Sequence, residues 1–82
     1  MNQKYSFAFM EFPIYRKYFN GMSFYKIISE IEFEEKQLVG SKVHKHQVIA
    51  NQFPEKLRIQ DMISCKDKIW ETMNESDYLK LD

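Results

Sequence analysis

The dipeptide Asn20-Gly21, between two runs of aromatic and β-branched residues, constrains this chain more than any other feature. Asn-Gly in that setting is the strongest short-range signal for a β-hairpin. A two-residue loop at this point predicts these cross-strand pairs: Ile14 with Ile27, Tyr15 with Lys26, Arg16 with Tyr25, Lys17 with Phe24, Tyr18 with Ser23, and Phe19 with Met22. Both faces of the predicted hairpin carry a mixture of polar and apolar side chains.

The length of the chain, 82 residues, predicts a single domain over residues 1–82. This is near the size at which one hydrophobic core gives only a small net stability. Seven Phe, five Tyr and one Trp supply large rings that can close such a core. The lone Cys65 has no internal disulfide partner, so we expect self-association as a further support and a homodimer as one form of the protein.

The chain carries no strong signal for export or for a membrane. The apolar run near its start is short, Glu11 and Pro13 end it, and no small-residue cleavage site follows. No segment approaches the roughly 20 apolar residues of a membrane span. A single unpaired cysteine is typical of a reducing compartment. We therefore expect a soluble, cytoplasmic protein with no membrane partner.

The segment after the hairpin contains two conflicting signals. Apolar and acidic residues alternate along it, which suits a strand, but Ser29-Glu30-Ile31-Glu32 is also a capping box that starts a helix. Residues 25–33 resemble residues 70–78, where Asn74 is also a good N-cap residue with an acid close behind it. Because acids in a first turn favour the helix dipole, we predict short helices over residues 30–38 and 75–81.

The remaining segments complete the predicted order. Residues 42–50 are rich in β-branched residues and read as a strand, and so do residues 68–73. Residues 54–64 are either strand or helix: Pro54 suits a first helical turn, but a helix would direct Leu57 away from Ile59, Met62 and Ile63, which favours a strand. Residues 1–12 are either an extra strand or a partly ordered lead. The prediction is an α+β fold in the order β-β-α-β-β-β-α, with a small antiparallel sheet and two short helices.

The hairpin contains the first candidate binding surface. Aromatic rings on a sheet can stack with bases while Arg and Lys hold phosphates. The residues that would do this are Tyr15, Arg16, Lys17, Tyr18, Tyr25 and Lys26. Against nucleic-acid binding stand the balance of 12 basic and 12 acidic residues and the lack of an RNA-binding consensus.

His44 and His46 would share one face of a strand, as two metal ligands do, but two ligands do not make a site. Cys65 has Lys66 and Lys68 beside it, but a catalytic cysteine also needs a base, an orienting group and an oxyanion site. The sequence, with only two glycines, has no phosphate-binding loop. We therefore predict no catalytic residue, cofactor or metal.

Protein interaction is the function that the sequence favours. The chain has more aromatic residues than a core of this size readily hides, and interaction surfaces favour such residues. The acidic residues 30–35 would offer a charged face to a basic partner. We predict a non-catalytic protein-interaction or regulatory module that binds another protein or a second copy of itself. The alternative is a single-stranded nucleic-acid-binding module that uses the basic, aromatic hairpin.

Overall fold

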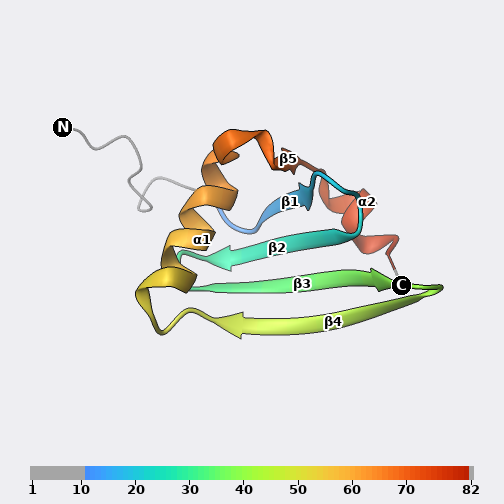
Figure 1. The fold of residues 1–82 in the computed structure, drawn as a ribbon, viewed down its shortest axis with the longest axis horizontal. Coiled ribbons are helices and arrows are strands. Elements are labelled where there is room, and N and C mark those ends of the chain that lie inside the picture. Colours follow the sequence, from blue (N-terminus) through green and yellow to red (C-terminus); the bar gives the residue numbers. More distant parts are fainter. Residues whose placement is uncertain (1–10, 82) are drawn as a thin grey trace.

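A five-stranded antiparallel sheet is the centre of the fold (Figure 1). The computed structural model describes residues 11–81. The strands are β1 (Ile14–Tyr18), β2 (Ser23–Ser29), β3 (Glu32–Val39), β4 (Lys42–Ile49) and β5 (Trp70–Thr72), in the spatial order β4-β3-β2-β1-β5. The helical elements are α1 (Phe53–Ser64), the short 3₁₀ turn η2 (Lys66–Lys68) and α2 (Glu75–Leu79). The predicted fold class is confirmed, and the predicted order matches except in two segments.

The β1–β2 hairpin has the predicted register. Ile14 pairs with Ile27, and the register continues unchanged to Lys17 and Phe24. The turn is wider than a two-residue loop, because the Gly21 N–H donates to Tyr18 O, and the Phe19 N–H donates across to Ile69 O. Gly21 holds a φ of +73°, the left-handed conformation that glycine adopts without steric cost. With this loop from Phe19 to Met22, the same residues pair across the hairpin as the Asn-Gly pattern predicted.

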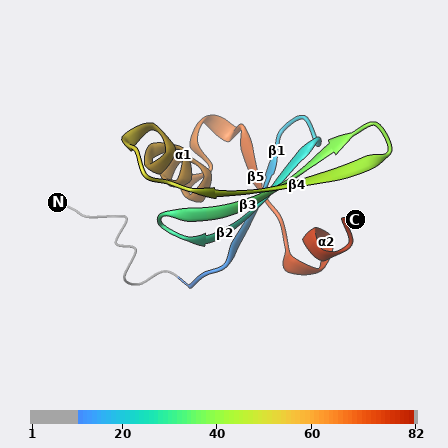
Figure 2. The ribbon, with the colours of Figure 1, turned by 90° about the horizontal axis from the view of Figure 1, so that it is seen from below.

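The two helices lie on opposite faces of the sheet (Figure 2). The core under α1 consists of Tyr25, Ile27, Phe33, Ala50, Ile59, Met62, Ile63 and Trp70. A smaller core under α2 consists of Tyr15, Phe24 and Tyr78. Because successive side chains of a strand point to opposite faces, neighbours such as Phe24 and Tyr25 serve different cores. This two-sided burial explains why neither face of the hairpin pattern is purely apolar.

The prediction of a helix over residues 30–38 is wrong, because residues 32–38 belong to β3 and residues 30 and 31 form the turn before it. The Ser29 hydroxyl accepts a hydrogen bond from the Ile31 N–H at 3.2 Å, which closes a tight turn between β2 and β3 instead of capping a helix. Ser29 then pairs with Glu32, and Phe33 pairs with Ile27 and enters the core under α1. Alternation of apolar and acidic residues was the stronger signal here, because β2 offers an edge on which the segment can pair. Residues 25–33 therefore do not share the order of strand, cap and helix that residues 70–78 adopt.

Residues 54–64, for which the sequence allows strand or helix and favours a strand, form most of α1. Phe53 and Pro54 occupy its first positions, where proline's missing N–H costs nothing. Ile59, Met62 and Ile63 face the sheet and are buried, while Leu57 is 41% exposed. The deduction that a helix would separate Leu57 from those three residues was correct. In α1, Leu57 lies at the surface while the other three residues face the core.

The other predicted elements are present, with shorter bounds at the end of the chain. β4 ends one residue before the predicted Ala50, β5 covers three residues of the predicted 68–73, and α2 ends at Leu79. Asn74 caps α2 as predicted, because its side-chain oxygen accepts from the Asp77 N–H at 2.9 Å. Of the predicted lead over residues 1–12, residues 1–10 lie outside the described part of the chain.

Candidate binding surface

The six residues of the predicted hairpin surface divide between the two faces of the sheet. Three of them, Arg16, Tyr18 and Tyr25, lie on the face that α1 covers, and the other three, Tyr15, Lys17 and Lys26, lie on the α2 face. Tyr15 is 8% exposed and Tyr25 3% exposed. The hairpin therefore does not present these six side chains as one exposed surface.

Arg16 has a structural role in holding α1. Its Nε donates to Met62 O and its second terminal nitrogen to Ile63 O, both at 2.9 Å. These carbonyls belong to the last turn of α1, where backbone acceptors have no partner within the helix and a cation is favoured by the helix dipole. Arg16 thus fixes the C-terminal end of α1 to β1, and its planar group is engaged by the backbone.

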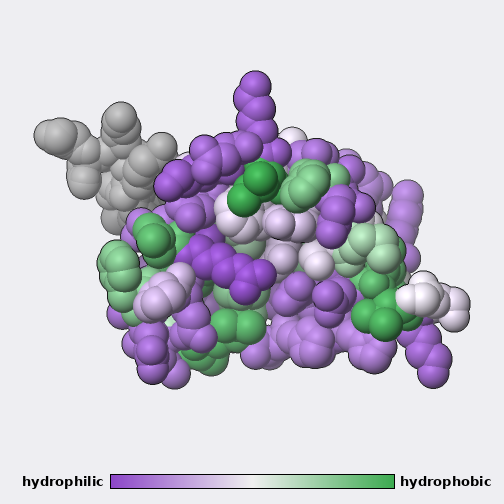
Figure 3. Space-filling view, viewed as in Figure 1, coloured by the Kyte–Doolittle hydropathy of each residue, from purple (hydrophilic) through white to green (hydrophobic). Residues whose placement is uncertain are grey.

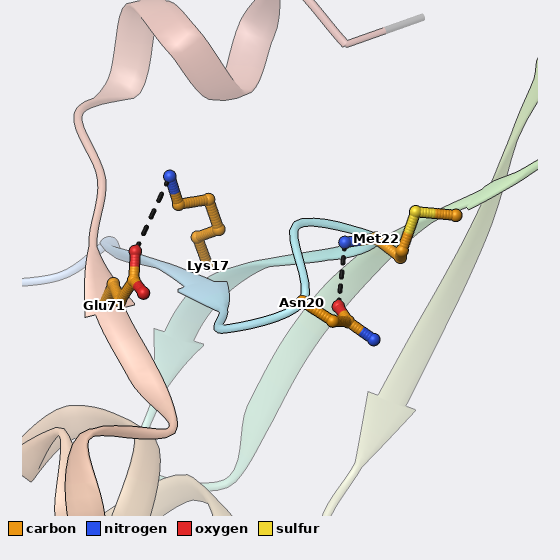
Figure 4. A network of polar contacts seen from close by, with 4 residues as sticks. All are labelled: Lys17, Asn20, Met22 and Glu71. Carbon is orange, nitrogen blue, oxygen red and sulfur yellow. Dashed lines mark hydrogen bonds and ion pairs between the residues drawn. The ribbon is translucent and has the colours of Figure 1, made fainter.

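Two other hairpin residues contact their neighbours in the sheet. Lys17 lies 3.6 Å from the Glu71 carboxylate of β5, which is an exposed ion pair (Figure 4). Tyr18 packs edge-on against Trp70, with ring centroids 6.2 Å apart. In the adjacent turn, the side chain of Asn20 accepts from the Met22 N–H at 2.8 Å (Figure 4). These contacts serve to join β1, β5 and the turn.

The two buried tyrosines of the hairpin, Tyr15 and Tyr25, lie near charged groups. Burial, and then the charge of Glu35, raise the pKa of Tyr25, while Arg58 lowers it; the Arg58 guanidinium donates to the Tyr25 hydroxyl at 3.2 Å. Burial raises the pKa of Tyr15 as well, and the nearby Glu75 carboxylate raises it further. Both hydroxyls therefore stay protonated over the ordinary pH range.

A second cation from the sheet holds α2. Lys36 of β3 is 3% exposed, and its Nζ donates to Tyr78 O and Leu81 O, both at 3.0 Å. The same ammonium lies 4.4 Å from the centroid of the Tyr78 ring, and the Tyr78 hydroxyl donates to Glu34 at 2.8 Å. Sequence reasoning missed this residue. The only signal was that neither helix has a basic residue in its own last turn.

The candidate metal and nucleophile residues lie apart from any such site. His44 and His46 are exposed on β4, and Cys65 is a free thiol at the left-handed residue that ends α1. Within residues 11–81, no three side chains of the metal-ligating types come together. A surface hollow of about 370 Å³ between β5 and α2 is lined by Thr72, Met73, Asn74 and Asp77. The Asn74 side-chain oxygen there is already engaged by the helix cap.

The strand β4 forms one edge of the sheet, and most of its residues are exposed (Figure 1). The Leu38 N–H of β3 bonds to Met22 on the β2 side, so by alternation the odd residues of β3 bond to β4. Their β4 partners are the even residues, for example His44 opposite Gln37 and His46 opposite Glu35. The N–H and C=O groups of the odd residues point outward, and no described residue bonds to them: Val43, Lys45, Gln47 and Ile49.

Exposed apolar side chains gather at one end of this edge, where β4 ends and α1 begins (Figure 3). We call these residues the apolar end: Ile31 (46% exposed), Ile49 (49%), Phe53 (74%) and Leu57 (41%). The Ala50 N–H donates to Ile31 O, which ties the β2–β3 turn to the end of β4. Phe53 and Leu57 are one helical turn apart. Exposed apolar groups beside an unpaired strand edge are typical of protein-binding surfaces.

Comparisons with known proteins add no relative: the chain matches no family model, no curated protein and no solved structure. Within residues 11–81, no helix has the length and apolar character to cross a membrane.

Proposed function

We propose that this protein is a non-catalytic interaction module that binds an extended segment of a partner protein along the outer edge of β4. In this mode of recognition the segment adds a strand to the sheet, and main-chain hydrogen bonds supply much of the affinity. The observation that carries the proposal is the edge itself. It is eight residues long and contains no proline, and its outward backbone groups have no partner in the described part of the chain.

The rest of the fold supports this use of β4. The opposite edge strand, β5, has only three residues, so it offers a much shorter template. Long edges of this kind are usually covered by another segment or carry residues that oppose pairing, and among residues 11–81 the basic side chains of β4 are the only such feature. The apolar end extends the edge with surface that a bound segment can bury. We also propose a cytoplasmic location, since Cys65 has no disulfide partner.

Single-stranded nucleic acid stays the alternative ligand, and a second copy of the chain is an alternative occupant of the edge. Stacking on the hairpin requires exposed rings, and the two most buried of its tyrosines would have to leave the core. A nucleic-acid site would also need the Arg16 guanidinium, which bonds to carbonyls of α1. These contacts favour the strand-addition proposal.

An amide NMR titration tests the proposal. The labelled protein is titrated with a pool of capped, extended eight-residue peptides of mixed charge, and separately with mixed single-stranded oligonucleotides. We expect the peptides to shift the amides of β4, with the largest downfield changes at the outward N–H groups of Val43, Lys45, Gln47 and Ile49. Oligonucleotide shifts confined to residues 16–26 that weaken with salt would instead favour the nucleic-acid alternative.

The variant Gln47→Pro provides a specific control. It removes one outward N–H without removing a hydrogen bond to β3, because the Gln47 N–H is on the open side of the edge strand. The matched variant Gln47→Ala retains that N–H but loses the side-chain hydrogen bond to Glu32. Peptide binding should fall in Gln47→Pro and persist in Gln47→Ala. The proposal fails if no peptide shifts β4, or if both variants bind equally well. Light scattering that shows a dimer in the wild type and in Gln47→Ala but not in Gln47→Pro would assign the edge to a second copy.

A further inference from the structure

We infer that the segment received by β4 is acidic, with carboxylates placed opposite Lys45 and Lys42; this inference rests on the function proposed above. β4 carries two lysines and two histidines and no acid. Lys42 and Lys45 are both exposed, and neither forms an ion pair with a described residue. The nearest fixed charges that an incoming strand meets are therefore positive.

The acids of β3 do not cancel this charge at the open edge. An added strand lies about 4.8 Å from β4 but about twice as far from β3, beyond the Debye length of about 8 Å at physiological salt. Two of the β3 carboxylates are also engaged, because Glu34 accepts from the Tyr78 hydroxyl and Glu32 from the Gln47 side chain.

The same charges oppose pairing between two copies of β4. An antiparallel β4–β4 contact with nearly full overlap is centred near Lys45 and His46, since these are the middle residues of the strand. Each such register places Lys45 opposite or next to a basic residue of the second copy. Like charges directly opposite are destabilising, and lysine on an edge strand is a common device against self-pairing. Charge complementarity therefore selects an acidic partner over a second copy.

The positions of the lysines define a pattern in the partner. Lys45 lies on the α2 face of β4 and Lys42 on the α1 face, so an antiparallel partner needs carboxylates three residues apart. Opposite Val48 and Ile49, near the apolar end, the partner is expected to be apolar. The peptide Val-Ile-Thr-Glu-Glu-Thr-Val-Glu, read antiparallel to β4, satisfies this pattern over all eight positions.

The test compares that peptide, with both ends capped, with a neutral twin that has Gln for Glu and a basic twin that has Lys for Glu. Dissociation constants come from the amide shifts of β4 at low salt. We expect the acidic peptide to bind about tenfold more tightly than the basic twin, because two cross-strand pairs change from opposite to like charge. The preference should shrink as salt is added.

Two double variants test whether Lys42 and Lys45 cause the preference for the acidic peptide. Lys42→Gln combined with Lys45→Gln should reduce the ratio of acidic to basic affinity to near one, while Lys66→Gln combined with Lys68→Gln, the same charge change in η2, should leave most of it. Binding of all three peptides at β4 with equal affinity, or a tighter basic twin, would overturn the inference and leave the proposed function standing. If no peptide shifts β4, it is the proposed function that fails.

Discussion

Arg16 provides the sharpest test of how this fold is held together. Its side chain donates two hydrogen bonds, each of 2.9 Å, to Met62 O and Ile63 O, and a third to Tyr15 O. The substitution Arg16→Met retains an apolar stem of similar length but removes every donor. The last carbonyls of α1 then lose their partner from β1, and the favourable interaction of a cation with the end of the helix dipole is lost.

The expected cost follows from the number and kind of these hydrogen bonds. A hydrogen bond to a charged group contributes about 1.5 to 3 kcal/mol, and we take the lower value because the Arg16 contacts are only partly buried. Loss of the two bonds to α1 is therefore expected to cost about 3 kcal/mol. A chain of 82 residues has a total stability of about 4 to 12 kcal/mol, so this one substitution removes a large share of it. The melting temperature should fall by about 12 to 24 °C.

Urea unfolding followed by tryptophan fluorescence measures this loss directly. Trp70, the only tryptophan, lies in the core under α1 and will report its opening. We expect a lower midpoint with an unchanged slope, since the surface exposed on unfolding is the same.

Lys17→Met is the matched control, because Lys17 is the next residue of β1, has the same charge and forms only an exposed ion pair with Glu71. Its expected cost is about 0.5 kcal/mol. Arg16→Lys, which keeps the charge without the planar group, should fall between the wild type and Arg16→Met. The reasoning is refuted if Lys17→Met costs as much as Arg16→Met, or if Arg16→Lys restores full stability.

Three further predictions concern stability. Burial raises the pKa of Tyr15 and Tyr25 above the ordinary value of 10.0, so above that pH the native state binds more protons than the unfolded state and stability falls as pH rises. Urea midpoints should decline from about pH 10 upward, and less steeply in the double Tyr→Phe variant; equal slopes would contradict this. Asn74→Ala removes the oxygen that accepts from the Asp77 N–H and should cost about 1 kcal/mol, whereas no change in midpoint would show that the cap is dispensable. Gly40→Ala should cost about 1 to 2 kcal/mol from backbone strain alone, since Gly40 has a φ of +64° and an added Cβ meets no atom within 4 Å; calorimetry of the variant should detect the shift.

The register of the first hairpin was predictable because turn position alone determines which residues pair. Asn20 and Gly21 mark the turn, and the pairing of Arg16 with Tyr25 follows from counting outward on both sides. The turn itself differs from the expected two-residue loop, because the Phe19 N–H is engaged by Ile69 of a distant segment. Long-range hydrogen bonds of this kind leave no trace in the local pattern.

The wrong helix over residues 30–38 and the unresolved choice over residues 54–64 have a common cause. Ser29 and Asn74 are both good helix caps by residue type, yet only Asn74 caps a helix, because the residues after Ser29 find a strand to pair with. In α1, the exposed Leu57 made the apolar pattern look unlike that of a helix. In both cases tertiary context, which the sequence does not display, overrode a local preference.

The candidate site was less predictable than the fold, since its main features arise from contacts between distant segments. Arg16 was predicted to belong to a binding surface and the sequence assigned Lys36 no role, but each reaches carbonyls more than 40 residues away along the chain. The open edge of β4 depends on strand order, which follows from the formation of β3 (Glu32–Val39) in place of the helix predicted over residues 30–38. Only the basic character of β4 itself was visible beforehand.

The strands that hold the two helices are different from the strand with the open edge. Each helix is fastened at its C-terminal end by a cation from a strand, α1 by Arg16 of β1 and α2 by Lys36 of β3. Neither fastening involves β4, which is joined to the fold through β3 and through its connection to α1. Since a strand that adds to β4 would bond only to its outward odd residues, it would leave the β3–β4 ladder and both helix anchors intact. Binding at this edge therefore requires no rearrangement of the core, and the general costs of association, which include ordering the partner segment, are not increased by a change in the fold.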